Sequence, residues 1–425
     1  MEIKQVNMKQ VAPTATSNSS LQKFMKSKTA MVVFFVGLFL VAVGGSWAIF
    51  SFVIKTPSTG VSTKAISGVR SKINPNLPKT EPCPINGMKY TAEEKSIWEG
   101  RRPAVVMVEN HVDSRPPEGL SRADMVYETV AEGGITRFAA VFYCGTAAGD
   151  VKVAPIRSSR FYFINWASEY GDRPLYVHVG GANDFGANGG PKPAGEIDPR
   201  VDAIGLLEKI GWRVPGGNDY DASYDAGYPI FFRDPERLGH PIAYEHTMTI
   251  STDALYKDAE TRGLAGTAKD GTAWTKGFVP YNFVDDSKAG APTASDISFE
   301  FWSNQPDYNV EWKYDATNNQ YLRFDGGKPH TDGDFNNEQL TAKNVVVMQI
   351  DETGPVDSEA HMIEDNVGTG KMQVFQNGNV INGTWSKTSR TARTVFTDAS
   401  GKQISFVRGP IWVEAIPTGN TVNYK

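Results

Sequence analysis

One long apolar stretch near the N-terminus constrains the fold more than any other feature of this chain. From Thr29 to Ile54 the sequence runs TAMVVFFVGLFLVAVGGSWAIFSFVI, about 26 residues without a charged side chain. Roughly 20 such residues are enough to cross the hydrocarbon core of a bilayer as a helix. A buried core helix is another interpretation, but such helices seldom stay apolar on every side over this length. We therefore expect one transmembrane helix at residues 29–54.

A cleaved signal peptide is the main alternative for this segment, because small residues follow its Leu-, Val- and Phe-rich part. The apolar part exceeds the usual length of about 7–15 residues, and no clean A-x-A cleavage site ends it. Lys23, Lys26 and Lys28 crowd its N-terminal side, which favours a cytoplasmic N-terminus by the positive-inside rule. The sequence thus favours a single-pass anchor in the plasma membrane, with residues 1–28 as a basic cytoplasmic tail.

The remainder of the chain is acidic and long enough for more than one hydrophobic core. The net charge of −5 combines +5 in residues 1–55 with −10 in the residues that follow. Proteins that bind nucleic acids neutralise phosphates with a basic surface, so the acidic ectodomain argues against a nucleic-acid partner. A length of 425 residues with 40% hydrophobic residues predicts two or three folded units.

Cys83 and Cys144 are the two cysteines of the chain. Both would lie outside the membrane, where a disulfide persists, but two separate thiols, with Cys144 buried at the end of a strand, explain them equally well. No CxxC, HxxxH or HExxH spacing accompanies them, and the chain has neither a GxSxG elbow nor a GxxxxGK[ST] phosphate-binding loop. We therefore expect no metal and no cofactor.

Changes in composition divide the extracytoplasmic part into three segments. Residues 55–99 begin with a stretch rich in Ser, Thr, Pro, Gly and Lys, which predicts a flexible stalk. Residues 100–285 combine strand-like runs such as AVVMVEN with helical spacing in SSRFYFINWASEY, which predicts a mixed, layered α/β sandwich domain. Residues 296–425 alternate apolar and polar residues between turn signals, which predicts a smaller antiparallel β-rich domain.

Several runs of residues within 100–417 form a recognisable set: RPAVVMVENH, EGGITRFAAVF, APIRSSRFYF, LYVHVGG, EHTMTISTDALY, VGTGKMQVFQNGNVINGTW and GPIWVEAIP. This set resembles the YerB-like family of bacterial envelope proteins. The resemblance implies a layered α/β sandwich, a location at the outer membrane face and no established activity. The chain differs from many relatives because no lipidation cysteine follows the apolar segment before Cys83. Ala154 and Thr247 also stand where relatives usually have Gly and Asn.

The segment Pro155–Arg160 (PIRSSR) is the sharpest polar cluster, at a predicted junction of a strand and a helix. Ser158 or Ser159 would cap the helix. Its first N–H groups and the guanidinium groups of Arg157 and Arg160 would then converge on a phosphate, pyrophosphate or carboxylate. The alternative is that these arginines pair with internal glutamates.

Glutamates of the preceding strand are the expected partners of these arginines. Glu128 shares a strand face with apolar neighbours, so it needs a cation or a proton when it is buried. The Gly133–Gly134 turn would bring Arg137 back toward Glu128 and Glu132. Candidates for acid–base catalysis are Glu109, Glu128, Glu132, His178 and His246. For both histidines, a purely structural role is the competing interpretation.

Three classes of function remain open. The first hypothesis is a non-enzymatic envelope factor that binds an anionic wall or lipid-linked component. Its ligand-binding residues would be Arg137, Arg157, Ser158, Arg160, Glu109 and His246. The second is a hydrolase or transferase acting on wall glycan or a phosphate-linked precursor, with a Glu as acid or base. The third is a structural scaffold or protein-interaction module. Tryptophans that could stack on sugars, or merely pack between strands, are Trp302, Trp312, Trp385 and Trp412.

Overall fold

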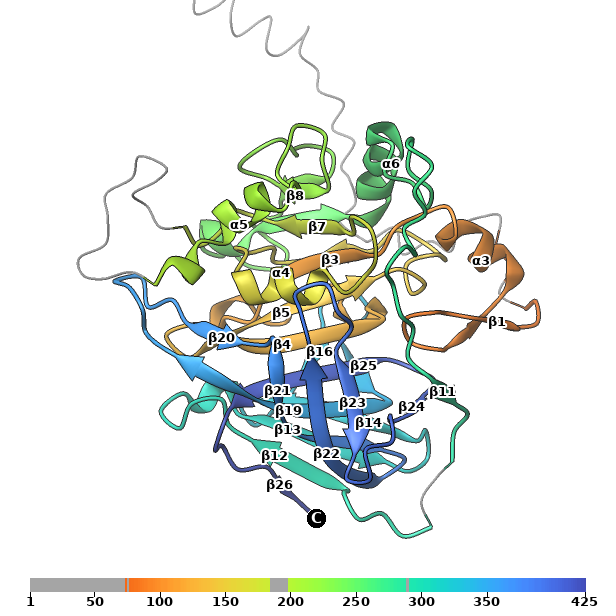
Figure 1. The fold of residues 1–425 in the computed structure, drawn as a ribbon, viewed down its shortest axis with the longest axis vertical. Coiled ribbons are helices and arrows are strands. Elements are labelled where there is room, and N and C mark those ends of the chain that lie inside the picture. Colours follow the sequence, from red (N-terminus) through yellow and green to blue (C-terminus); the bar gives the residue numbers. More distant parts are fainter. Residues whose placement is uncertain (1–72, 75, 184–197, 288–289) are drawn as a thin grey trace, which may run out of the picture. The chain divides into compact units, whose positions relative to one another are not determined.

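The computed structural model describes residues 73–74, 76–183, 198–287 and 290–425 (Figure 1). The predicted cytoplasmic tail, the predicted transmembrane helix and residues 55–72 of the predicted stalk lie outside these residues. Among the described residues, no helix is both long enough and apolar enough to cross a bilayer. The described part is rich in strands and contains few helices.

The centre of the fold is one large sheet built from both halves of the chain. Its strands, in spatial order, are β23 (Val395–Asp398), β22 (Asn379–Lys387), β21 (Gly368–Gln376), β19 (Asn344–Thr353), β25 (Ile411–Pro417), β4 (Met125–Glu132), β5 (Ile135–Phe142), β3 (Ala104–Glu109), β7 (Leu175–His178) and β8 (Asp219–Asp221), with β20 (Ile363–Asp365) paired to β19. The domain boundary that we predict near residues 285–296 thus separates strands that share a sheet.

Strands β3, β4 and β5 lie at the middle of this sheet and are buried on both faces. Near-continuous apolar runs are typical of such strands, because both sides of the sheet must be covered. The β4–β5 hairpin turns at Gly133 and Gly134, whose φ angles are 57° and 84°. Residues with a Cβ rarely adopt such angles, so the EGGITR sequence is well suited to this turn.

Two hydrophobic clusters cover the two faces of the large sheet. On one face lie the helices α4 (Phe161–Ala167) and α5 (Ala203–Lys209), as Figure 1 also shows. The opposite face packs against helix α6 (Thr252–Arg262), a small sheet and a second, larger sheet. The small sheet consists of β6 (Lys152–Val153), β10 (Met248–Ser251) and β9 (Phe231–Arg233). The result is a layered arrangement with the core on both sides of the large sheet.

The second sheet belongs to the C-terminal segment. It is formed by β15 (Lys328–Pro329), β14 (Gln320–Asp325), β13 (Val310–Asp315), β12 (Asp296–Phe299) and β26 (Asn423–Tyr424), with β18 (Thr341–Ala342) paired to β14. Its pairs are antiparallel, as the alternating sequence predicts. Strand β25 differs, because it runs parallel to both β19 and β4. The expectation of a purely antiparallel C-terminal region is therefore wrong at this strand.

The prediction of a flexible stalk does not hold for residues 81–99. They form β1 (Glu81–Pro82), β2 (Lys89–Tyr90) and α3 (Ala92–Trp98), which starts with a capping box at Thr91. Trp98 is buried, and a disulfide joins Cys83 to Cys144. Remaining short pairs are β11 (Phe283–Val284) with β24 (Phe406–Val407) and β16 (Thr331–Asp332) with β17 (Glu338–Gln339).

Candidate functional site

The predicted junction of strand and helix is present, but the helix is not capped as the sequence suggests. Helix α4 begins after Arg160, and no side chain accepts a hydrogen bond from its first turn. The Ser159 hydroxyl instead lies 2.7 Å from the Tyr176 hydroxyl. The carbonyl of Ser158 accepts a hydrogen bond from Arg137 at 3.1 Å. A short uncapped helix cannot form the predicted anion cradle, so any such site depends on the arginine side chains.

Arg137 and Arg160 converge on a single carboxylate at the end of the β4–β5 hairpin. Arg137 donates to Glu132 Oε1 and Arg160 donates to Glu132 Oε2, both at 2.6 Å. Both guanidinium groups are buried, with residue exposures of 2% and 5%, and within the described part of the chain the Nε of each has no hydrogen-bond partner. Two buried cations therefore share one directly bound carboxylate, which leaves an excess of positive charge.

This excess charge strongly favours the ionised form of Glu132. Burial raises the pKa of Glu132, but the attraction of Arg137, Arg160 and Arg157 outweighs burial and holds it at about 2. A carboxyl group with such a pKa stays ionised near neutral pH and is a poor proton donor or acceptor. Glu132 thus fits an electrostatic role better than acid–base catalysis.

Arg157, Glu109 and His246 form the outer part of the same site. Arg157 Nε lies 3.0 Å from Glu109 Oε1, and the other carboxylate oxygen, Oε2, lies 2.7 Å from His246 Nδ1. The side chain of Arg157 is 28% exposed, whereas that of Glu109 is 4% exposed. Arg157 is therefore the cation of this group with the most direct access to solvent. We call Arg137, Arg157, Arg160, Glu109, Glu132 and His246 the arginine cluster.

Glu128 does not join the arginine cluster, contrary to our expectation. It is fully buried on the opposite face of the sheet, where Arg323 of β14 donates to it at 2.5 Å. The reason is strand alternation: Arg137 pairs with Thr129 across the hairpin, one residue from Glu128, and successive side chains point to opposite faces. An irregularity in the register between Val130 and Glu132 explains how Glu132 reaches the other face.

Arg323 is the residue that sequence reasoning missed. It also donates to Glu414 at 2.6 Å, and both residues are fully buried. Burial and the neighbouring Glu414 raise the pKa of Glu128 to about 8 against the attraction of Arg323. The sequence offers one signal for this residue. In the alternating pattern of β14, Arg323 stands on the same, buried face as Tyr321 and Asp325, where an apolar residue is usual. Because Glu128 has no access to solvent, a catalytic role for it is not supported by this geometry.

His178 is also enclosed. Its Nε2 lies 2.6 Å from Asp219 Oδ1 and its Nδ1 lies 2.7 Å from the carbonyl oxygen of Gly180. The side chain is fully buried. Burial lowers the pKa of His178, but Asp219 and Asp221 more than offset this, and the pKa is raised. This is the arrangement of a structural histidine that joins β7 to β8.

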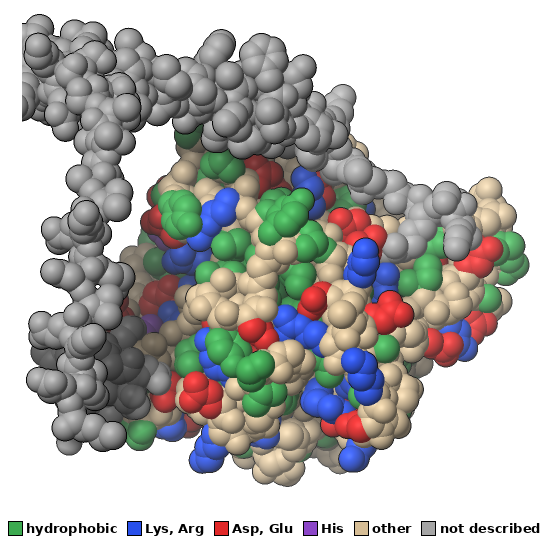
Figure 2. Space-filling view, turned by 90° about the horizontal axis from the view of Figure 1, so that it is seen from above, with side chains coloured by type: hydrophobic (Ala, Val, Ile, Leu, Met, Phe, Trp, Pro, Cys, Tyr) green, Lys and Arg blue, Asp and Glu red, His purple; other side chains and the backbone are tan. Residues whose placement is uncertain are grey.

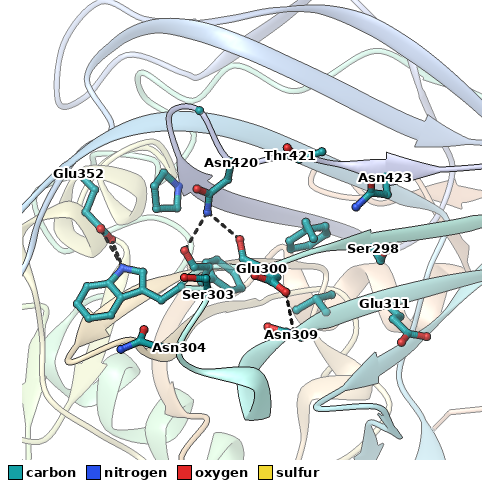
Figure 3. Close-up of a pocket in the computed structure, with 16 residues that line it drawn as sticks. Ser298, Glu300, Ser303, Asn304, Asn309, Glu311, Glu352, Asn420, Thr421 and Asn423 are labelled. Atoms are coloured by element: carbon teal, nitrogen blue, oxygen red, sulfur yellow. Dashed lines mark hydrogen bonds between the residues drawn. The ribbon is translucent and has the colours of Figure 1, made fainter.

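A separate cavity of about 880 Å³ lies at the edge of the C-terminal sheet (Figure 3). Trp302 and Glu352 form one wall, and the indole N–H donates to both carboxylate oxygens at 2.9 and 3.1 Å. Its other polar lining residues are Ser298, Glu300, Ser303, Asn304, Asn309, Glu311, Asn420, Thr421 and Asn423. Trp302 is half-buried, whereas Trp312, Trp385 and Trp412 are buried in the core. No residue of the arginine cluster lines this cavity.

Comparison with known proteins agrees with the resemblance seen in the sequence. Residues 87–265 match the N-terminal domain, and residues 297–413 the C-terminal domain, of a family described as "Protein of unknown function (DUF3048)". The chain is 28% identical over 343 residues to "Putative lipoprotein YerB" of Bacillus subtilis (strain 168). These aligned residues cover 81% of this chain and 88% of that protein.

The fold is also similar to a solved structure. The crystal structure of YerB protein from Bacillus subtilis superposes with a TM-score of 0.60 and 24% sequence identity, over 80% of this chain and 99% of that one. Both domain matches and the fold thus lead to the same group of proteins. The chain belongs to the YerB-like (DUF3048) family.

Proposed function

We propose that this chain is a membrane-anchored envelope protein that binds an anionic wall or lipid-linked component through its arginine cluster. Residues 29–54 would hold it in the plasma membrane, with the N-terminus in the cytoplasm and the remaining chain outside. The apolar stretch, the name of the Bacillus relative as a lipoprotein and the Cys83–Cys144 disulfide support this location, because disulfides persist mainly outside the cytoplasm.

The observation that carries the ligand proposal is the buried excess of positive charge around Glu132. Burial of a charge without a partner is costly, and a bound anion would supply the missing partner. On the face shown in Figure 2, acidic and basic side chains intermingle among the described residues. Binding would therefore depend on a built site and less on a broad field of one sign. Arg157 would be the first contact, because it is the most exposed arginine of the cluster.

The decisive experiment is a binding screen on the full chain in detergent, with a soluble glycerol-phosphate polymer, phosphatidylglycerol in mixed micelles and a polycarboxylate as probes. One charge-assisted hydrogen bond contributes about 1.5–3 kcal/mol, so Arg157→Gln should weaken binding by about 10- to 100-fold. Arg408→Gln is a matched control, because Arg408 is also 28% exposed and pairs with one carboxylate, Asp285, at 2.8 Å.

The outcomes separate the remaining hypotheses. Equal binding by wild type and folded Arg157→Gln would refute the arginine cluster as the site. If wild type binds none of the probes, the scaffold hypothesis gains support, and protein partners should be sought. Loss of binding in both the Arg157 and the Arg408 variants would indicate a non-specific charge effect.

A second candidate function is glycan recognition at the cavity of Figure 3. An aromatic ring bordered by carboxylates and amides is a common way to hold a polyhydroxylated ligand. Behind Glu352 lies the fully buried Glu364, whose pKa is raised well above its usual value by burial and by Glu352. Burial and the neighbouring Glu352 thus favour the protonated form of Glu364, and a protonated carboxyl group is what a glycan hydrolase uses as its acid.

The glycan hypothesis predicts a quench or shift of tryptophan fluorescence when soluble wall oligosaccharides are added. Trp302→Ala should abolish the response and Glu352→Gln should weaken it. Tyr228→Ala serves as the control, because Tyr228 is 87% exposed and lies outside the cavity. An unchanged response in Trp302→Ala would exclude this cavity. If wild type releases products from the oligosaccharides and Glu352→Gln does not, this would indicate turnover at the cavity.

A further inference from the structure

We propose that His111, Asp113 and His246 form a binding site for a divalent transition-metal ion of the Zn²⁺ type. One potential ligand atom from each of these residues lies within 4.8 Å of the other two. His111 and Asp113 follow the end of β3, and His246 ends the short helix Tyr244–His246 that precedes β10. The fold thus brings together ligands from two distant parts of the sequence.

The imidazole rings of His111 and His246 are stacked on each other. Their centroids are 5.1 Å apart, with 21° between the ring planes. The N–H of Asp113 donates to His111 Nδ1 at 3.2 Å, and the Asp113 carboxylate lies 3.7 Å from the same nitrogen. Rotations of the partly exposed His111 side chain (30%) and the exposed Asp113 side chain (76%) would bring all three ligands onto one ion.

Glu109 provides an independent sign that His246 is prepared for a metal. Its carboxylate lies 2.7 Å from His246 Nδ1, and both side chains are almost fully buried. A carboxylate beside one ring nitrogen orients the imidazole and directs the other nitrogen, Nε2, toward a metal. This arrangement of carboxylate, histidine and metal is common around zinc. The sequence does not reveal it, because local spacing motifs detect only ligands that are close along the chain.

The chemistry of the ligands selects the class of ion. Two imidazoles and one carboxylate suit Zn²⁺ and similar transition metals, whereas Mg²⁺ and Ca²⁺ prefer oxygen ligands. Three protein ligands leave a fourth position of a tetrahedral ion open, which is typical of zinc sites that bind a further ligand. Since Arg157 contacts the other oxygen of Glu109 at 3.0 Å, an anion on that fourth position would lie near Arg157. The metal site itself does not depend on the proposed anion.

Calorimetric titration of the chelator-treated full chain with ZnCl₂, in chloride buffer without added phosphate, tests this inference. Wild type should bind one ion per chain. His246→Ala and Asp113→Asn should each lower the affinity at least 10-fold, and Glu109→Gln should lower it by about 10- to 100-fold. His240→Ala is the control, because His240 is exposed and lies outside the group. Reductant must be left out, since free Cys83 and Cys144 thiols beside Asp124 would offer a second site.

The outcomes are distinct from those of the anion screen. Co²⁺ should give a visible d–d absorption that His246→Ala removes, which reports the ligands directly. The inference is overturned if wild type shows no saturable Zn²⁺ binding, or if Asp113→Asn and His246→Ala bind as wild type does. Asp113→Asn keeps the test valid if His246→Ala fails to fold, because the Asp113 side chain is largely exposed. Zn²⁺ binding without anion binding would support the metal site and refute only the anion proposal.

Discussion

Replacement of Arg323 by methionine removes the cation that contacts both Glu128 and Glu414 in the core. Arg323 Nη2 and Nη1 donate to these carboxylates at 2.5 and 2.6 Å, and all three side chains are fully buried. Removal of one partner from a buried ion pair typically costs about 3–5 kcal/mol, because the remaining charge has no compensation. We expect Arg323→Met to lower the free energy of unfolding by this amount at pH 7.

The loss should depend on pH in a defined direction. Burial raises the pKa of Glu128 from 4.5 to about 8 in the presence of Arg323, and without Arg323 it would rise further. Above pH 4.5 the folded variant then binds protons that the unfolded chain has released, so its stability falls as pH rises. The wild type shows the same fall only up to about pH 8, where its Glu128 ionises beside Arg323. The difference in stability between wild type and Arg323→Met should therefore widen from about pH 8 upward and be smaller at pH 5.

Urea unfolding followed by tryptophan fluorescence measures this effect, since Trp312 and Trp412 lie beside the Arg323 guanidinium. Arg408→Gln, which loses a surface ion pair, should change stability by less than about 1 kcal/mol. The triple variant Arg323→Met, Glu128→Gln, Glu414→Gln should recover part of the loss, because no buried charge remains uncompensated. The reasoning fails if Arg323→Met unfolds like wild type, or if the loss is larger at pH 5 than at pH 8.

Three further predictions concern stability. The pKa of Glu132 is about 2, against 4.5 in the unfolded chain. Ionised Glu132 should therefore contribute roughly 3 kcal/mol to the free energy of unfolding above pH 4.5, and this contribution is lost as pH falls toward 2. In Glu132→Gln the free energy of unfolding should depend less on pH between 4.5 and 2. Burial raises the pKa of Glu118 to about 7, so stability from this group is lost as pH rises from 4.5 through 7. Glu118→Gln should remove that decline; an unchanged profile would contradict the assignment. The Cys83–Cys144 disulfide spans 61 residues, so reduction should cost about 4 kcal/mol in the loop-entropy description; equal unfolding midpoints with and without reductant would contradict it.

Local patterns predicted the elements whose stability is mainly local. Helix α6 begins at Thr252 and ends at Arg262, because Ser251 caps its start and Gly263 adopts the left-handed conformation at its end. The strand-like run AVVMVEN forms β3, as predicted, because its residues 104–108 are all apolar. The prediction that Ser158 or Ser159 caps α4 is wrong. The Ser159 hydroxyl instead bonds to Tyr176 of β7, a tertiary contact that local propensity does not include.

Local patterns also predicted part of the candidate site, but not the part that depends on strand register and order. The Gly133–Gly134 turn and the PIRSSR segment were enough to place Arg137 and Arg160 near Glu132. They could not show that the register irregularity at Val130 and Glu132 separates the two glutamates onto opposite faces. Long-range pairs such as Arg323 with Glu128, 195 residues apart, depend on the strand order, which local patterns do not encode.

The strand order also bears on how the two family domains depend on each other. Strand β25 of the C-terminal segment pairs with β4 in parallel, with Glu414 beside Glu128. An isolated N-terminal segment would therefore expose the edge of β4 and leave Glu128 without Arg323. The same β4 carries Glu132, on which Arg137 and Arg160 converge. The C-terminal segment thus stabilises the strand that positions the arginine cluster, although it contributes none of the cluster's side chains. Variants at Arg323 should consequently weaken anion binding through loss of folded protein, whereas Arg157→Gln should weaken it with the unfolding free energy nearly unchanged.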